Sequence, residues 1–271
     1  MRYEYSTLNI FAQDGDALKA AEILRGEIES RTGKLPEITG SDRADISFIA
    51  DPDGLRDGYE IEQNGKCLVF KAQGIRGLIF AAGMFLRKIE VSGKKITLIQ
   101  DIGGRYKPDK RIRGHQLGYR TTPNSYDAWD IEDYRRYYLD LMFFGCNTVE
   151  HIPSNGLDAK KNRLMKYDPQ DLLVEASRIA DEYDLDVSLW YPNDRESLED
   201  ADKRRRCVFE RTPRIDIMFP PGGDPGDYKA DEFIRRCREF SRLLKEYHPN
   251  AEMWPSAQQP HLIPDWGERL M

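Results

Sequence analysis

The sequence of 271 residues contains 39% hydrophobic and 32% charged residues, a composition typical of a globular protein with one large domain or two smaller ones. Its formal net charge of −6 argues against a nucleic-acid partner, and no stretch reaches the ~18 apolar residues that a membrane-spanning helix requires. The first residues also lack the apolar core of a signal peptide, so the sequence predicts a cytoplasmic location, with an exported form whose leader has been removed as the open alternative.

The beginning of the chain alternates strands and helices in a compact pattern. Residues 3–12 are expected to form a strand, and apolar residues at helical spacing predict a following helix that ends at Gly33. A short strand is expected over 46–50. Asn64-Gly65 then predicts a tight hairpin, because both residues tolerate positive φ.

A second helix, with apolar residues from Ile75 to Ile89, and a strand over 95–100 complete this part of the chain. Gly74 and Gly77 open the helix without matching a phosphate-binding motif, which favours close packing of the helix against a sheet. Together these elements predict a small α+β sandwich, with helices on one face of a mainly antiparallel or mixed sheet.

A polar, turn-rich segment from Gly103 to Arg111 is expected to link this first domain, residues 1–105, to a second domain over 106–271. In the second domain strand and helix alternate with a period of roughly 35 residues, as in a (β/α)8 barrel or a doubly wound sheet. The expected strands cover 115–119, 147–152, 186–190, 215–219 and 251–254. The sequence thus predicts an α/β protein, in which a small α+β sandwich precedes an incomplete TIM barrel with about five of its eight units.

The run from Pro213 to Gly226 predicts a buried parallel strand that ends in a turn rich in proline and glycine. This turn presents one carboxylate, Asp224. Functional side chains of parallel α/β folds gather at the carboxyl ends of the strands, so Asp224 is a candidate catalytic residue. The alternative is that Asp224 caps the helix that begins near Tyr228.

Three short motifs together resemble the β-N-acetylhexosaminidases of glycoside hydrolase family 20. They are Arg113-Gly114 before the first strand of the second domain, Glu150-His151-Ile152 at the end of the second strand, and Gly222-Gly223-Asp224 after the fourth. Those enzymes also place a small α/β domain before their barrel, with a helix like Arg76 to Leu86. The resemblance therefore covers both parts of the chain.

The α-glucuronidases of family 67 are similarly organised. Their barrel units resemble the segment from Asp133 to Asn147, and their fourth-strand loop runs into a pair like Pro225-Gly226. From the motifs alone the two families stay open as alternatives.

Glycosidic cleavage usually requires two carboxyl groups, one protonated to assist the leaving oxygen and one ionised. In family 20 an Asp steers the acetamido group of the substrate and the following Glu is the acid. The resemblance implies the first role for Asp224, whereas Pro225 stands where the acid would be. Under the family 67 comparison Asp224 itself is the candidate acid.

The other candidate residues are expected to bind the sugar. The resemblance implies that Arg113 holds sugar hydroxyls, since a guanidinium fork suits paired oxygens. Glu150 and His151 form a polar pair at a strand end that binds hydroxyls or sets the pKa of a neighbour. Trp190 and Trp254 end two strands, where an aromatic face stacks against a sugar ring; a packing role is the alternative.

These observations predict a glycoside hydrolase, or a fragment of one, that removes terminal hexosaminide or glucuronide residues from oligosaccharides. The isolated chain is expected to be inactive and to self-associate through an open barrel edge. Pro225 motivates the alternative of a non-catalytic carbohydrate-binding or scaffold protein. A metal-dependent hydrolase using His115 and His151 is a weaker alternative, because neither histidine lies in a local ligand motif. The four cysteines are far apart in the sequence and form no zinc motif. No cofactor is therefore expected.

Overall fold

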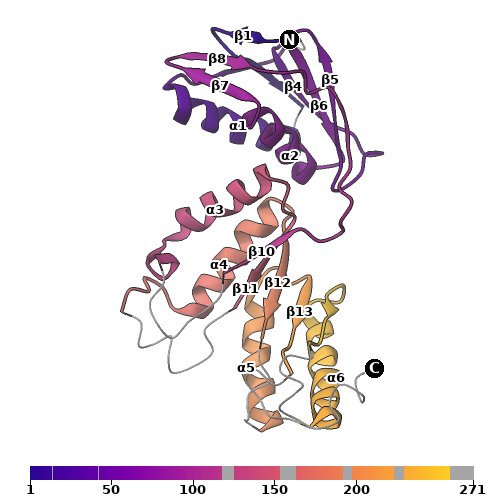
Figure 1. Cartoon of the computed structure of the whole chain (residues 1–271). Coiled ribbons are helices and arrows are strands. Elements are labelled where there is room, and N and C mark those ends of the chain that lie inside the picture. The colour runs from indigo at the N-terminus through magenta and orange to yellow at the C-terminus, as the bar shows by residue number, and fades with distance from the viewer. Residues whose placement is uncertain are drawn as a thin grey trace. The chain divides into compact units, whose positions relative to one another are not determined.

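The computed structural model describes residues 1–13, 15–41, 43–117, 125–152, 163–191, 197–222 and 229–256. The chain divides into two compact units, which Figure 1 shows in the colours of the chain order. Unit 1 comprises Met1–Arg113 and Leu139–Asn147, and unit 2 comprises Gly114–Tyr138 and Thr148–Met271. No helix of the described residues has both the length and the apolar character needed to cross a membrane.

Unit 1 contains a mixed sheet of six strands and an antiparallel sheet of three. The six-stranded sheet has the order β3-β2-β4-β6-β5-β9, with β5 antiparallel to both of its neighbours and the other pairs parallel. Its strands are β2 (Asn9–Ala12), β3 (Glu37–Thr39), β4 (Ile46–Ala50), β5 (Tyr59–Asn64), β6 (Cys67–Ala72) and β9 (Gly104–Tyr106). The smaller sheet, β1-β8-β7, consists of β1 (Tyr3–Tyr5), β8 (Lys95–Leu98) and β7 (Ile89–Ser92). The predicted mixed sheet and the hairpin at Asn64-Gly65 are confirmed.

Three expectations for unit 1 are wrong. The strand expected over 3–12 is two strands in different sheets, because residues 6–8 carry the chain from one sheet to the other. The second helix ends before Ile89, whose backbone pairs with Leu98 in the small sheet. Residues 104–106, expected in a linker, pair as β9 with the edge of β5.

The two helices of unit 1, α1 (Asp16–Thr32) and α2 (Ile75–Leu86), lie on one side of the six-stranded sheet (Figure 1). Gly33 ends α1 in the left-handed conformation, with φ 65°, and donates its N–H to a carbonyl of the last turn. Gly77 lets α2 pack closely: a Cβ there would lie 2.6 Å from the Gly58 carbonyl oxygen and from the Ala72 side chain of β6. This contact confirms the predicted role of the glycine.

Unit 2 is built on a sheet of five parallel strands in chain order, β10-β11-β12-β13-β14. They are β10 (Gly114–Leu117), β11 (Thr148–His151), β12 (Asp186–Trp190), β13 (Ile217–Phe219) and β14 (Glu252–Met253). Helices α3 (Ile131–Phe143), α4 (Pro169–Glu182), α5 (Leu198–Arg211) and α6 (Ala230–Tyr247) connect successive strands. In a doubly wound sheet the order of the strands reverses at a switch point. The five strands described in unit 2 follow the chain order without such a reversal.

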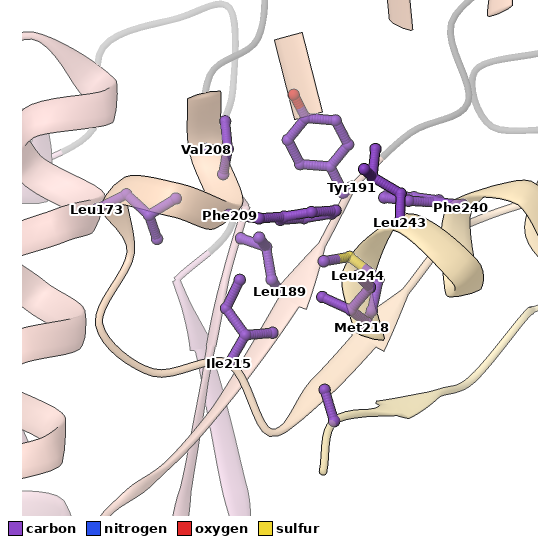
Figure 2. Close-up of a cluster of buried hydrophobic side chains, with 11 residues drawn as sticks. Leu173, Leu189, Tyr191, Val208, Phe209, Ile215, Met218, Phe240, Leu243 and Leu244 are labelled. Atoms are coloured by element: carbon purple, nitrogen blue, oxygen red, sulfur yellow. The ribbon is translucent and has the colours of Figure 1, made fainter. Parts of the chain in front are cut away.

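The core of unit 2 lies between this sheet and its helices (Figure 2). Leu189 of β12 and Met218 of β13 pack against side chains from three helices, including Leu173 of α4. Phe209 of α5 and Phe240 of α6 stack with ring centroids 5.7 Å apart, and both rings are almost completely buried. The helices therefore cover the sheet face that carries Leu189 and Met218.

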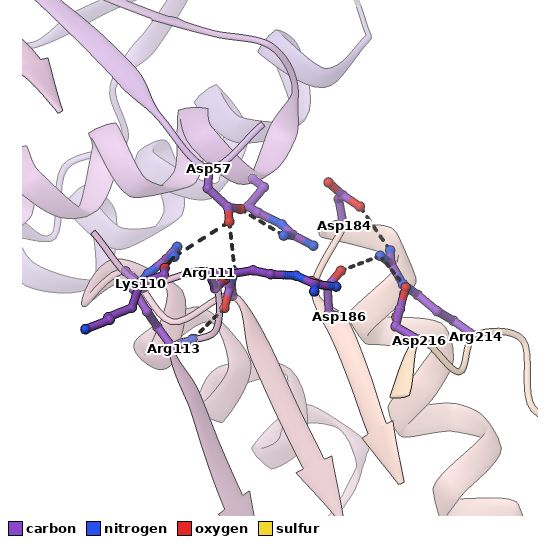
Figure 3. Close-up of polar contacts among 11 residues, drawn as sticks. Asp57, Lys110, Arg111, Arg113, Asp184, Asp186, Arg214 and Asp216 are labelled. Atoms are coloured by element: carbon purple, nitrogen blue, oxygen red, sulfur yellow. Dashed lines mark hydrogen bonds and ion pairs between the residues drawn. The ribbon is translucent and has the colours of Figure 1, made fainter. Parts of the chain in front are cut away.

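The amino ends of β12 and β13 are held by one arginine, Arg214, whose side chain is 13% exposed. Its guanidinium pairs with Asp184 at 3.1 Å, Asp186 at 2.8 Å and Asp216 at 2.7 Å (Figure 3). Burial alone would lower the pKa of Arg214, but the hydrogen bond to Asp216 and the neighbouring carboxylates raise it above its ordinary value. This cluster stabilises the end of the sheet opposite to the one where parallel α/β folds place their sites.

Candidate functional site

The register of the parallel strands assigns each side chain of the sheet in unit 2 to one of its two faces. His151 of β11 pairs with Leu189, and Leu189 pairs with Met218, so these three lie on the face that the helices cover. Successive side chains of a strand point to opposite faces. Glu150 and Ser188, which precede them and pair with each other, therefore lie on the opposite face. The four helices described in unit 2 pack on the first face, so we call the opposite one the helix-free face.

A row of polar side chains crosses the helix-free face. Ser188 Oγ donates to one carboxylate oxygen of Glu150 at 2.7 Å, and Gln116 Nε2 of β10 donates to the other. The row continues in register through Ile217 of β13 to Glu252 of β14. An ionised carboxylate accepts hydrogen bonds at both oxygens, so its two neighbours fix the orientation of Glu150. We call the four polar residues of this line, Gln116, Glu150, Ser188 and Glu252, the polar row.

A row of aromatic side chains lies one step closer to the carboxyl ends on the same face. Trp190 pairs with Phe219, and the pairing of β13 with β14 continues so that Trp254 lies beside Phe219. Neighbouring strands are about 4.8 Å apart, which separates the backbones of the two tryptophans by about 10 Å. Trp254 is 37% exposed and donates its indole N–H to Glu252 at 2.8 Å. This aromatic row therefore joins the polar row through Trp254 and Glu252.

Asp224 lies outside the described residues, as does Pro225. The chain that leads to them is held in place: Pro221 forms a parallel bridge with Ser256, and the Gly222 N–H donates to the Ser256 carbonyl at 2.7 Å. The ladder between β13 and β14 thus continues for several residues beyond the strands themselves.

His151 does not join Glu150, although the two are neighbours in the sequence. Its side chain is buried on the helix face, where Nε2 lies 2.7 Å from the hydroxyl of Tyr138 on α3. Burial lowers the pKa of His151 from 6.5 to about 4 and raises the pKa of the Tyr138 hydroxyl, so both side chains are neutral near pH 7. This position suits a packing role rather than contact with a sugar on the other face.

Arg113 also lies away from the two rows. It precedes the first residue of β10 and so marks the amino end of that strand, and it belongs to unit 1. Its Nε donates to the Gly145 carbonyl and its Nη1 to the Lys110 carbonyl, both at 2.7 Å. The structure therefore does not place Arg113 in either row, and the sugar-binding role that the resemblance implies for Arg113 stays a prediction.

Of the sequence-based candidates, the structure places Glu150, Trp190 and Trp254 on one face of the sheet. It adds Gln116 and Ser188, which two-residue alternation in aligned strands could have indicated. Across the described ranges, no group of three or more His, Cys, Asp or Glu side chains is arranged to hold a metal ion.

The comparisons with known proteins support the fold. No family model matches the sequence, and no curated protein does. Among solved structures, the chain is similar to a β-hexosaminidase from Streptomyces plicatus, with 12% identity and a TM-score of 0.72 over 94% of this chain and 62% of that one. It is also similar to a family 20 β-N-acetylhexosaminidase from Streptomyces coelicolor, with 11% identity and a TM-score of 0.69 over 94% and 63%.

A β-N-acetylhexosaminidase from Bacteroides fragilis gives a TM-score of 0.64 at 10% identity, again over 94% of this chain and 63% of that one. The chain therefore has the fold of part of a family 20 hexosaminidase and spans less than two thirds of the length of these enzymes. The resemblance to the family 67 α-glucuronidases finds no support in these structures.

Proposed function

We propose that the protein is a glycoside hydrolase, or a part of one, that binds a terminal hexosaminide at the carboxyl ends of its parallel strands. The observation that carries this proposal is the pair of rows on the helix-free face: the oriented carboxylate of Glu150 lies one strand from Trp190, and Trp254 follows on the same face, bonded to Glu252. The fold shared with hexosaminidases favours a hexosaminide over a glucuronide.

Each row has a part in this proposal. The rings of Trp190 and Trp254 offer apolar faces to a sugar ring, while Glu150 accepts hydrogen bonds from its hydroxyls. In a barrel, the helix-free face is the interior, and the carboxyl ends open onto the site. We assign Asp224, which follows β13 in the sequence, to contact with the reacting end of the sugar.

The alternative is a carbohydrate-binding protein without turnover. It is favoured by Pro225, which follows Asp224 where the resemblance to family 20 expects the acid, since proline has no proton to donate. Binding and turnover therefore have to be measured separately.

The test is the purified chain with an aryl N-acetyl-β-hexosaminide, an aryl β-glucuronide and the product N-acetylglucosamine. If the native chain hydrolyses the hexosaminide and Asp224→Asn abolishes this activity, the hydrolase is supported. Binding of N-acetylglucosamine without turnover, unchanged in Asp224→Asn, supports the alternative. Preference for the glucuronide, or neither binding nor turnover of any compound, contradicts the proposal.

A further inference from the structure

Unit 1 contains a hollow of about 380 Å³ that the proposed function does not use. Its wall combines cationic side chains, Arg87, Arg105, Lys107 and Arg113, with aromatic ones from β5, α2 and β9. This volume lies at the lower end of the range typical of small-molecule sites, roughly 300–1,000 Å³.

The charge of the hollow is opposite to that of the whole protein, which carries −6. Four cations face a single lining carboxylate, Asp57, which is already paired with the buried Arg76 at 2.9 Å. Glu60 pairs with Arg105 at 2.9 Å. Among the described residues, Arg87 hydrogen-bonds to Tyr59, and neither Arg87 nor Lys107 is paired with a carboxylate. The hollow is therefore cationic after its own acids are counted.

Arg113 has an unused donor at this hollow. Its Nε and Nη1 bond backbone carbonyls, and its Nη1 lies 3.6 Å from Asp57 (Figure 3). Its Nη2 is buried and has no hydrogen-bond partner among the described residues. A buried donor without a partner is unfavourable, and an oxyanion that accepts from it would remove this penalty.

The aromatic side chains offer flat surfaces beside these charges. Tyr59 and Tyr106 are stacked, with ring centroids 4.8 Å apart and planes 17° apart. Burial raises the pKa of Tyr59 to about 12, so this phenol stays neutral at physiological pH. On another part of the wall, Arg87 lies over the ring of Phe144, which is 75% exposed. Such surfaces suit a ring rather than a bare ion.

We propose that this hollow binds a small ring that carries an oxyanion, namely a carboxylated or phosphorylated sugar or nucleotide. The oxyanion accepts from Nη2 of Arg113 and pairs with Arg87 and Lys107, while the ring packs against Tyr59 and Tyr106. The site belongs entirely to unit 1 and does not depend on the function proposed for unit 2.

The test is isothermal titration of the purified chain with glucuronate, glucose 6-phosphate, AMP, inorganic phosphate and neutral glucose. We expect at least one ring-bearing anion to bind with a dissociation constant below about 10 mM and to exceed both inorganic phosphate and glucose. Whichever of glucuronate, glucose 6-phosphate and AMP binds most tightly shows whether the natural ligand is a sugar or a nucleotide. The proposal is overturned if no ring-bearing anion binds, or if phosphate or glucose binds as tightly.

Two variants locate the binding. The double variant Arg87→Gln, Lys107→Gln should weaken the binding of the anion by about fivefold or more, because the anion loses two exposed ion pairs with the protein. The matched control is Lys19→Gln on α1, an exposed lysine outside the hollow, which should change the affinity by less than about twofold. Equal effects of the double variant and the control would overturn the site, provided that circular dichroism shows all variants folded.

Discussion

His151 gives a prediction that separates a packing role from a role in ligand binding. Its ring is 8% exposed and burial lowers its pKa to about 4, against 6.5 for an unburied histidine. Above pH 6.5 the ring is neutral in the folded and unfolded states. Between pH 6.5 and 4 only the unfolded state takes up a proton, so stability falls as the pH falls, and below pH 4 this histidine causes no further loss.

The size of this loss follows from the two pKa values. Their difference corresponds to about 3 kcal/mol, at about 1.4 kcal/mol for each tenfold change in proton affinity. The variant His151→Gln keeps a polar group for the Tyr138 hydroxyl but cannot titrate. We expect its free energy of unfolding to fall between pH 7 and pH 4 by about 3 kcal/mol less than that of the native protein.

The assay is urea unfolding followed by circular dichroism at pH 7, 5.5 and 4. Tyr138→Phe is the control: it removes the hydroxyl, which costs about 1 kcal/mol, but leaves His151 buried, so the pH dependence should persist. If His151→Gln shows the same pH dependence as the native protein, the histidine is not held neutral by burial and the reasoning is refuted.

Three further substitutions test other parts of the structure. Phe209→Ala removes the ring that stacks on Phe240 and should lower the free energy of unfolding by about 3–5 kcal/mol in urea; a loss below about 1 kcal/mol would contradict the packing. Asp57→Asn removes the carboxylate that pairs at 2.9 Å with the guanidinium of Arg76, which is 1% exposed, and should cost about 3 kcal/mol, whereas an unchanged urea midpoint would argue against the ion pair. Glu150→Gln should weaken binding of N-acetylglucosamine by about tenfold with little change in thermal stability, and unaltered affinity would remove Glu150 from the site.

The parallel sheet of unit 2 could be predicted largely from the sequence. The strands expected over 147–152, 186–190, 215–219 and 251–254 contain β11 to β14, because buried parallel strands are short apolar runs bounded by helices and turn residues. The start of α4 also has a local signal, because Asp168 is followed by Pro169: the Asp168 side chain accepts from the Gln170 N–H, and Pro169 lies in the first turn.

The two sheets of unit 1 could not be separated in this way. Residues 3–12 contain neither Gly nor Pro to mark a break, and the pattern contains no signal that Tyr5 pairs with Ile96 while Ile10 pairs with Ile38. Such pairings are set by contacts between segments far apart in the chain. A local pattern therefore predicts the strand but not the sheet that it joins.

The site shows the same limit at the level of single residues. Glu150 and His151 read as one polar pair because they are adjacent, yet adjacent residues of a strand point to opposite faces. Arg113 matched a motif, but its place before β10 puts it at the amino end of the strand. Motif order was informative about the fold, and only the register showed which side chains share a face.

The most direct test of the proposed function is the affinity for N-acetylglucosamine of the native protein and of Trp254→Ala, measured by isothermal titration. Trp129→Phe, which alters a ring packed against Tyr134 and Tyr137 near α3, is the control. We expect Trp254→Ala to bind about tenfold more weakly than the native protein, equivalent to about 1.4 kcal/mol, and the control to bind normally. Equal affinity of Trp254→Ala and the native protein would contradict a sugar site on the helix-free face.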